Sequence, residues 1–191
     1  MGKQGSFLKR LTDVIISILL LLPSLPILII AAIAIKIESR GPVFFTQKRS
    51  GVNGVEFTIY KLRTMVQGSE NGDVWTQKND KRITAVGRLL RKTSIDELPQ
   101  LINVLIGDMS IIGPRPEVPS VVINYTPEQQ KVLKYKPGIT GYSQVNGRAA
   151  IELNKKLMMD IEYSERETFF SDLKILLKTP LVVISNDGNI M

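Results

Sequence analysis

An uncharged run of 22 residues near the amino terminus, from Val14 to Ile35, constrains this chain more than any other feature. As a straight helix the run would reach about 33 Å, enough to cross the hydrocarbon core of a bilayer. Pro23 and Pro26 lie in its middle, and the hydroxyl of Ser24 between them can bond a carbonyl that a proline leaves free. Three structures compete for this run: a cleaved signal peptide, a simple transmembrane helix, and a hairpin that enters the bilayer and returns to the same side.

The flanks of the run favour the hairpin. The run is too long for the apolar core of a cleaved signal peptide and contains two prolines, which disfavours that alternative. Basic residues stand on both sides, with Lys3, Lys9 and Arg10 before the run and Lys36, Arg40, Lys48 and Arg49 after it. Because a single span concentrates positive charge on one face, basic flanks on both sides indicate that both ends face the cytoplasm. A single transmembrane helix remains the alternative.

Composition limits the partners and the chemistry. The net charge of +7 in 191 residues favours anionic partners, and its concentration around the apolar run points to anionic lipid rather than nucleic acid. The chain contains neither Cys nor His, so disulfides, cysteine nucleophiles and histidine bases are excluded. A metal ion, if one is used, is expected to be oxygen-ligated, as Mg²⁺ is.

The remaining chain predicts an α+β fold that is mostly helical. Val-, Phe-, Thr- and Tyr-rich runs predict strands over residues 43–47 and 55–60, joined by a turn at 50–54. Helices are expected over 83–92, from the carboxylate pair at 96–97 through 105, and over 126–136, 150–165 and 169–185. Residues 66–80 and 138–148 are expected to be loops, and 111–116 a stiff connection. We therefore divide the chain into a membrane segment, 1–40, and a folded domain outside the membrane, 41–191.

The adjacent carboxylates Asp96 and Glu97 are the leading catalytic candidates. Basic residues precede them, and Arg115 follows, held between two prolines. Acidic side chains framed by arginines suit a phosphate and a metal ion. The alternative is helix capping without catalysis. Ser94 begins a capping-box pattern, although Pro99 would then remove a helical hydrogen bond, whereas Asp96 as the cap would place Pro99 within the first turn.

Other polar residues are weaker candidates, each with an ordinary structural explanation. Lys61 and Arg63 leave the second predicted strand together and are often simply solvated charges. Gln144 and Arg148 lie in a turn sequence, QVNGR. Asp160 and Tyr163 lie three residues apart on a predicted helix, where a structural hydrogen bond is expected.

These segments together resemble one family. The segments are FLKRLTD, the apolar run, GPVFFTQKRSGVNG, YKLRTM, RKTSIDELPQLINVLIGDMSIIGPRP, KPGITGYSQVNGR and DIEYSERETFFSDLKILLKT. In this order they are similar to the bacterial sugar transferases of the monotopic phosphoglycosyl transferase family, the polyprenyl-phosphate hexose-1-phosphate transferases. The resemblance spans nearly the whole chain. It implies a re-entrant membrane hairpin, amphipathic helices at the interface, and a catalytic domain on the cytoplasmic face of the bacterial inner membrane.

The resemblance also implies a two-step reaction. Asp96 would attack the β-phosphate of a UDP-sugar, release UMP and hold the sugar phosphate covalently until a polyprenyl phosphate, such as undecaprenyl phosphate, displaces it. Glu97 would be its partner in the dyad, and Mg²⁺ the expected ion, with Asp96 as a ligand. Arg91 and Arg115 would lie around the phosphate or nucleotide. Four further matching positions would also bind substrate, with their individual roles left open, namely Lys61, Arg63, Gln144 and Arg148. Lys9 and Arg10 would lie at the interface, where Lys9 could meet the lipid phosphate.

Two features depart from the family pattern. The family carries an adjacent Ser-Pro at the membrane break, whereas Leu25-Pro26 stands here, with Pro23 and Ser24 just before it. The chain also ends soon after Ser185 and has no extra amino-terminal domain, which fits a minimal catalytic form. The donor sugar, the glycan pathway and the oligomeric state stay open, as does a role for downstream glycosyltransferases. A membrane-anchored basic module that binds anionic lipid or a partner protein is the rival function.

Overall fold

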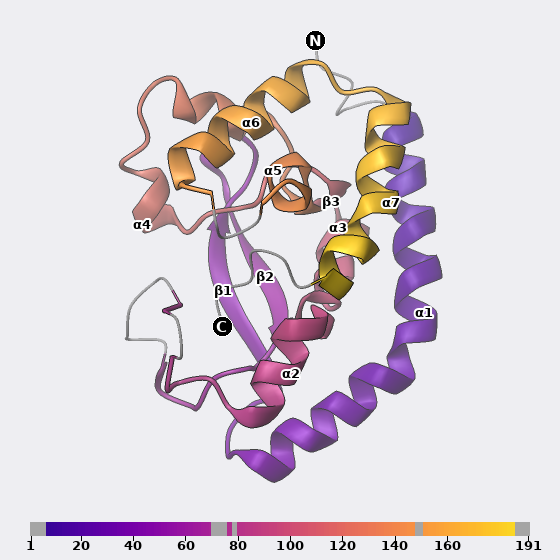
Figure 1. The fold of residues 1–191 in the computed structure, drawn as a ribbon, viewed down its shortest axis with the longest axis vertical. Helices are drawn as coiled ribbons and strands as arrows, with labels where there is room; N and C mark the ends of the chain where they lie inside the picture. Colours follow the sequence, from indigo (N-terminus) through magenta and orange to yellow (C-terminus); the bar gives the residue numbers. More distant parts are fainter. Residues whose placement is uncertain (1–6, 70–75, 78–79, 148–150, 186–191) are drawn as a thin grey trace.

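The computed structural model (Figure 1) describes residues 7–69, 76–77, 80–147 and 151–185. Its amino-terminal helix, α1 (Phe7–Glu38), runs along one side of the molecule and bends near its middle. Pro23 and Pro26 lie in that part of the helix, and the Ser24 hydroxyl donates to the carbonyl of Leu21 at 2.8 Å. The expected interruption is therefore a bend within one continuous helix. By length and composition, α1 could cross a membrane.

The predicted β-hairpin is confirmed. Strand β1 (Phe44–Ser50) pairs antiparallel with β2 (Glu56–Leu62), and a short 3₁₀ turn, η2 (Val52–Gly54), connects them. Asn53 and Gly54 both adopt positive φ, of 55° and 76°. Asparagine and glycine tolerate this region better than other residues, which explains why the turn forms here.

A second, parallel pair of strands was not predicted. Strand β3 (Ser110–Ile112) pairs with β4 (Gly138–Thr140), in segments that we expected to be a stiff connection and a loop. Each strand has only three residues, too few for a periodic pattern. The backbones of the two segments approach so closely that a Cβ on Gly138 would lie 2.1 Å from the Gly113 nitrogen. Glycine is therefore required at position 138, where the two backbones are in contact.

The helices largely follow the predicted ranges. The chain continues through α2 (Ala85–Thr93), η4 (Ile95–Glu97), α3 (Gln100–Ile106), α4 (Pro119–Val122), η5 (Gln129–Lys134), α5 (Tyr142–Val145), α6 (Leu153–Glu165) and α7 (Phe169–Ser185). The bounds of α7 agree with the prediction. Three predictions were wrong in detail. The helix from the carboxylate pair is divided into η4 and α3, the expected helix 126–136 contains a 3₁₀ segment, and the expected loop 138–148 contains β4 and α5. The mostly helical α+β class is confirmed.

Polar side chains fasten the first part of α1 to the rest of the fold. The buried carboxylate of Asp13 accepts the Ser110 hydroxyl at 2.9 Å and the Ile111 N–H at 3.0 Å. Arg10 donates to the carbonyl of Leu105 at 2.7 Å, at the end of α3. These bonds place α1 against the main core, which includes Val104.

The carboxyl end of α1 is joined to α2. The Glu38 carboxylate accepts the N–H groups of Ala85 and Val86, at 2.7 and 3.0 Å. A carboxylate at a helix amino terminus satisfies free N–H groups and complements the helix dipole. Arg63 donates to the carbonyls of Arg40 and of Ser39, the latter at 2.9 Å. The apolar helix thus ends on the element that precedes the carboxylate pair.

Close packing of α2 on the segment after β2 gives a test of the fold. A Cβ on Gly87 would lie 2.0 Å from the carbonyl oxygen of Thr64. We expect Gly87→Ala to lower the free energy of unfolding by about 2 kcal/mol or more, because backbone must move to admit the methyl group. Thermal unfolding of the purified protein measures this.

The matched control is Leu89→Ala on the same helix, since Leu89 is 61% exposed. It should change the stability by less than about 0.5 kcal/mol. A Gly87→Ala protein as stable as the control would contradict the packing of α2.

Candidate active site

The carboxylate pair lies in η4, between α2 and α3. Ser94 ends α2 with a φ of 55°, which turns the chain into η4. The capping alternatives are wrong, because the Ser94 side chain makes no cap hydrogen bond and Pro99 occupies the cap position of α3. Asp96 is 7% exposed, so an acidic side chain is buried here without capping a helix.

Two cations hold the Glu97 carboxylate. Its Oε1 accepts the Lys61 ammonium at 2.7 Å and the Arg115 guanidinium at 3.0 Å. Burial alone would raise the pKa of Glu97, but the charges and hydrogen bonds of Arg115 and Lys61 outweigh it and hold the pKa well below its usual range. Glu97 is therefore ionised throughout the physiological range.

Asp96 has a different environment from its neighbour. Its carboxylate accepts no hydrogen bond from the described residues, although Lys61, Arg91 and Arg115 lie near enough to stabilise its charge. Burial, together with the negative charge of Glu97, outweighs these cations and raises the pKa of Asp96 to about 6. At neutral pH Asp96 is thus an ionised, poorly solvated carboxylate, a suitable nucleophile towards phosphorus.

The cations around the pair come from three different elements. Lys61 is near the end of β2, Arg91 lies in the last turn of α2, and Arg115 follows β3. Arg91 is fixed by hydrogen bonds to the hydroxyls of Thr64, at 2.8 Å, and Thr76, at 3.0 Å. The side chain of Arg115 is 43% exposed and can reach a ligand. Together these residues form a cluster of basic side chains that could bind a phosphate.

Arg63 and Gln144, also predicted to bind substrate, have hydrogen-bond partners away from the pair. Arg63 is 6% exposed and donates to carbonyls at the end of α1, as described above. Gln144 donates to the carbonyl of Ile139 at 3.0 Å, while its Oε1 is buried without a hydrogen-bond partner among the described residues. Arg148 lies outside the described residues.

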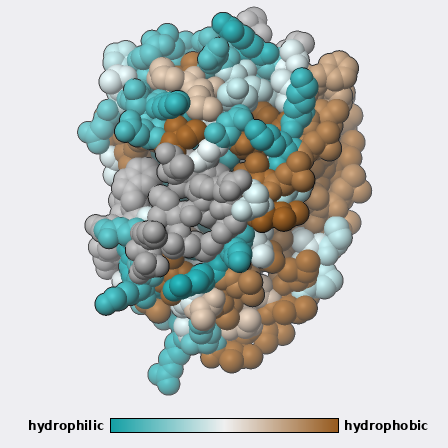
Figure 2. All heavy atoms as spheres, in the orientation of Figure 1, coloured by the Kyte–Doolittle hydropathy of each residue, from teal (hydrophilic) through white to brown (hydrophobic). Residues whose placement is uncertain are grey.

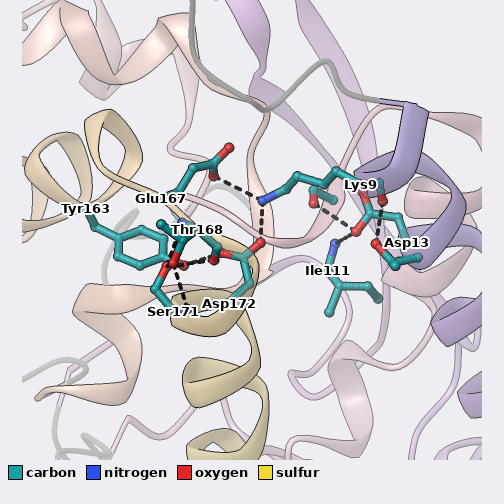
Figure 3. A network of polar contacts seen from close by, with 10 residues as sticks. Lys9, Asp13, Ile111, Tyr163, Glu167, Thr168, Ser171 and Asp172 are labelled. Atoms are coloured by element: carbon teal, nitrogen blue, oxygen red, sulfur yellow. Dashed lines mark hydrogen bonds and ion pairs between the residues drawn. The ribbon is translucent and has the colours of Figure 1, made fainter.

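Lys9 and Arg10, expected at the lipid interface, have partners within the protein. The Lys9 ammonium contacts Asp172 at 2.8 Å and Glu167 at 3.1 Å, and its side chain is only 11% exposed (Figure 3). The hydroxyl of Tyr163 also donates to Asp172. Arg10 binds the end of α3. Both residues therefore fasten α1 to neighbouring helices, which is a structural role that the sequence did not indicate.

Asp160 and Tyr163 share a face of α6, as predicted, but each has its own partner. Asp160 accepts the N–H and hydroxyl of Ser143, whereas Tyr163 bonds to Asp172.

Sequence reasoning missed Thr64, which orients Arg91, and Arg49, which donates to the carbonyl of Pro116 at 3.1 Å. Both lie in motifs that we quoted, but their partners are distant in sequence.

The residues fit a magnesium ion only in a limited way. Among the described residues, no three acidic side chains gather in a way that could hold a metal. Glu97 is engaged by two cations, which leaves Asp96 as the available carboxylate. Mg²⁺ often binds through one or two carboxylates, with water and substrate phosphates completing its coordination. Asp96 suits such an ion, held mainly by the substrate.

Comparison with known proteins identifies the family of this chain. Residues 4–186 match the family described as Bacterial sugar transferase. The sugar transferase EpsL of Bacillus subtilis is 43% identical over 95% of this chain and 89% of that protein. The UDP-glucose:undecaprenyl-phosphate glucose-1-phosphate transferase of Caulobacter vibrioides is 43% identical over 94% of this chain and 71% of its own length. The Escherichia coli enzyme of the same description is 42% identical over 90% of this chain, but only 39% of its own length.

The chain therefore belongs to the bacterial sugar transferase family, and it is an enzyme of the transferase class. The resemblance that the sequence motifs indicated is confirmed.

Because the two carboxylates have different environments, we expect substitutions of Asp96 and Glu97 to change the stability of the protein in opposite directions. The pKa of Asp96 in the folded protein, about 6, lies above that of an unfolded aspartate, so its ionisation opposes folding above about pH 4, and fully so above pH 6. We expect Asp96→Asn to stabilise the protein at pH 7.5, by up to about 3 kcal/mol, and by less at pH 5. Thermal unfolding midpoints at the two pH values measure this.

Glu97→Gln is the matched control. Because the pKa of Glu97 is lowered in the folded protein, its ionised form stabilises folding, and the substitution should destabilise the protein at pH 7.5. Equal effects of the two substitutions would refute the different environments of the two carboxylates.

Proposed function

We propose that this enzyme transfers a sugar 1-phosphate from a UDP-sugar to a polyprenyl phosphate, such as undecaprenyl phosphate, and releases UMP. The observation that carries the proposal is the buried, ionisable Asp96 carboxylate beside Glu97 and three cations. Relatives whose names state a UDP-glucose:undecaprenyl-phosphate glucose-1-phosphate transferase activity support it. Such a product, a polyprenyl diphosphate sugar, would begin assembly of a polysaccharide or another glycoconjugate.

In the first step an Asp96 oxygen attacks the β-phosphorus of the donor. The new bond joins Asp96 to phosphorus, the bond from phosphorus to the bridging oxygen breaks, and UMP leaves with that oxygen. In the second step a phosphate oxygen of the polyprenyl phosphate attacks the same phosphorus and releases the Asp96 carboxylate. The transferring group carries its charge on equatorial oxygens, which Lys61, Arg91 and Arg115 are placed to neutralise.

Glu97 has a supporting role in this mechanism. Its ionised carboxylate holds Lys61 and Arg115 in place before the substrate arrives, so that their orientation need not be created during the reaction. Its negative charge also raises the pKa of Asp96 and so makes that nucleophile more basic. Mg²⁺, when bound, would supply further charge neutralisation for the phosphates, with Asp96 as a ligand.

We further propose that the enzyme is monotopic, with α1 as a re-entrant hairpin and residues 41–191 on the cytoplasmic face of the bacterial inner membrane. The bend of α1 and the basic residues on both sides of its apolar run support this. Apolar side chains are also exposed on α7, where Phe170, Leu177 and Leu181 are 74%, 64% and 67% exposed. Figure 2 shows an apolar surface on the side occupied by α1 and α7. These faces suit the interfacial region of the bilayer.

Loss of Arg115 should slow the first chemical step. We expect Arg115→Ala to reduce the rate of UMP release from a UDP-sugar by about 10²-fold, as for loss of a donor to a developing anion. Asp96→Asn should abolish the release. The assay follows UMP with a panel of UDP-hexoses, with and without Mg²⁺ and undecaprenyl phosphate.

Arg166→Ala is the control, since Arg166 is 79% exposed and pairs with Glu162 on the surface of α6. Its rate should equal that of the wild type. A wild-type protein that binds lipid but releases no UMP from any donor would refute the proposed function and favour a binding module.

Membrane topology can be tested directly because the chain has no native cysteine. In intact cells, cysteines introduced as Gly5→Cys and Arg40→Cys should both resist a membrane-impermeant thiol reagent, since both ends of the hairpin would face the cytoplasm. Both should react after the membrane is opened. Labelling of one position but not the other in intact cells would establish a single span instead.

A further inference from the structure

One edge of strand β2 is paired with a side chain in place of a third strand. Among the described residues β2 has β1 as its only strand partner, and the backbone bonds of Val55 and Arg63 to the β1 side leave Thr58 and Tyr60 directed to the other edge. There the side-chain amide of Asn103, in α3, supplies both partners. Its Nδ2 donates to the Thr58 carbonyl at 2.7 Å, and its Oδ1 accepts the Tyr60 N–H at 3.1 Å. Asn103 thus bonds to the strand as a neighbouring strand would.

The amide of Asn103 fits this edge in one register only. Asn103 is 0% exposed, and its two partners are of opposite kinds, a carbonyl and an N–H two residues apart. The apolar cluster that joins β2 to α3, which includes Phe57, Ile59 and Val104, favours contact but gives it no direction. A donor and an acceptor at fixed places therefore define where α3 lies along β2.

The two elements that Asn103 joins lead to the two sides of one ion pair. Lys61 directly follows Tyr60 in β2, and Glu97 lies in η4, just before α3 in the chain. The Lys61 ammonium contacts the Glu97 carboxylate at 2.7 Å, and the two side chains are 15% and 20% exposed. Burial lowers the pKa of Lys61, and the charge of Glu97 opposes that shift. Displacement of β2 from α3 would therefore weaken both the position and the charge of this cation.

We propose that Asn103 is a positioning residue for Lys61 in the transfer reaction. By fixing β2 against α3, it holds the Lys61 ammonium beside Glu97, ready for the charge that develops on the transferring phosphoryl group. Because Asn103 is fully buried, it acts through the backbone of β2 and does not touch the substrate. The inference rests on the proposed function, which assigns Lys61 to the transferring phosphate.

Double-mutant cycles test the proposal, with kcat and KM for UMP release as the readout. Asn103→Ala should lower kcat by about tenfold or more with a smaller change in KM, because a displaced Lys61 is lost chiefly from the transition state. In a Lys61→Met background the same substitution should lower kcat by less than about twofold. In an Arg115→Ala background the tenfold loss should persist, because Glu97 still holds Lys61 there.

A second variant keeps the test possible if the alanine variant does not fold. Asn103→Asp retains the shape of the side chain and the acceptor for Tyr60, but it loses the donor to the Thr58 carbonyl. It should lower kcat in the otherwise wild-type enzyme and in the Arg115→Ala background, and change it by less than about twofold in the Lys61→Met background.

Asp13 provides a matched control. It is 6% exposed and also joins two elements, α1 and β3, by accepting the Ser110 hydroxyl and the Ile111 N–H. Neither of these elements carries Lys61. Asp13→Ala should lower the thermal unfolding midpoint as Asn103→Ala does, while any effect on kcat should be the same with and without Lys61.

The outcomes separate the two proposals. Equal losses from Asn103→Ala with and without Lys61, or an unchanged kcat in the otherwise wild-type enzyme, would overturn the positioning role alone. A wild-type enzyme that releases no UMP would overturn the proposed function, and this inference with it.

Discussion

The two ion pairs of Glu97, with Lys61 and Arg115, are the interaction on which the proposed chemistry of the site depends. With Lys61 at 2.7 Å and Arg115 at 3.0 Å, this carboxylate stays ionised, and its charge opposes ionisation of the adjacent Asp96. The pKa values of two neighbouring acidic residues therefore shift in opposite directions because their environments differ, and we assign them different roles on this basis. Glu97 organises the cations, while Asp96 remains buried, basic and available to react.

The rest of the fold brings distant cations to this point. Lys61 comes from the hairpin, Arg91 from α2 and Arg115 from the segment after β3. Glu97 holds both Lys61 and Arg115, whereas Thr64 holds Arg91. The close backbone contact between Gly113 and Gly138, beside the paired strands β3 and β4, sets the path of the segment that carries Arg115. Bonds from Asp13, Arg10 and Glu38 fasten the apolar helix to this framework. The apolar helix α1 and the candidate active site thus form one connected structure.

Much of this could be predicted from the sequence, for identifiable reasons. The hairpin has two strand-like runs with a turn between them, and α7 has a long apolar pattern, so local signals determined both. The carboxylate pair and Arg115 stood out because their residue types are unusual together. Strands β3 and β4 could not be predicted, because three residues are too few to show a periodic pattern. The structural bonds of Arg63 and Lys9 join residues far apart in sequence, and a basic side chain alone does not reveal its partner.

The most direct test of the central claim is to look for the covalent intermediate on Asp96. The enzyme would be incubated with a UDP-sugar and Mg²⁺, without polyprenyl phosphate, quenched, and analysed by intact-mass and peptide mass spectrometry. The mechanism predicts that the protein gains the mass of one sugar phosphate, located at Asp96, and that undecaprenyl phosphate removes it. An active enzyme that never carries this adduct, or carries it on another residue, would contradict the role of Asp96.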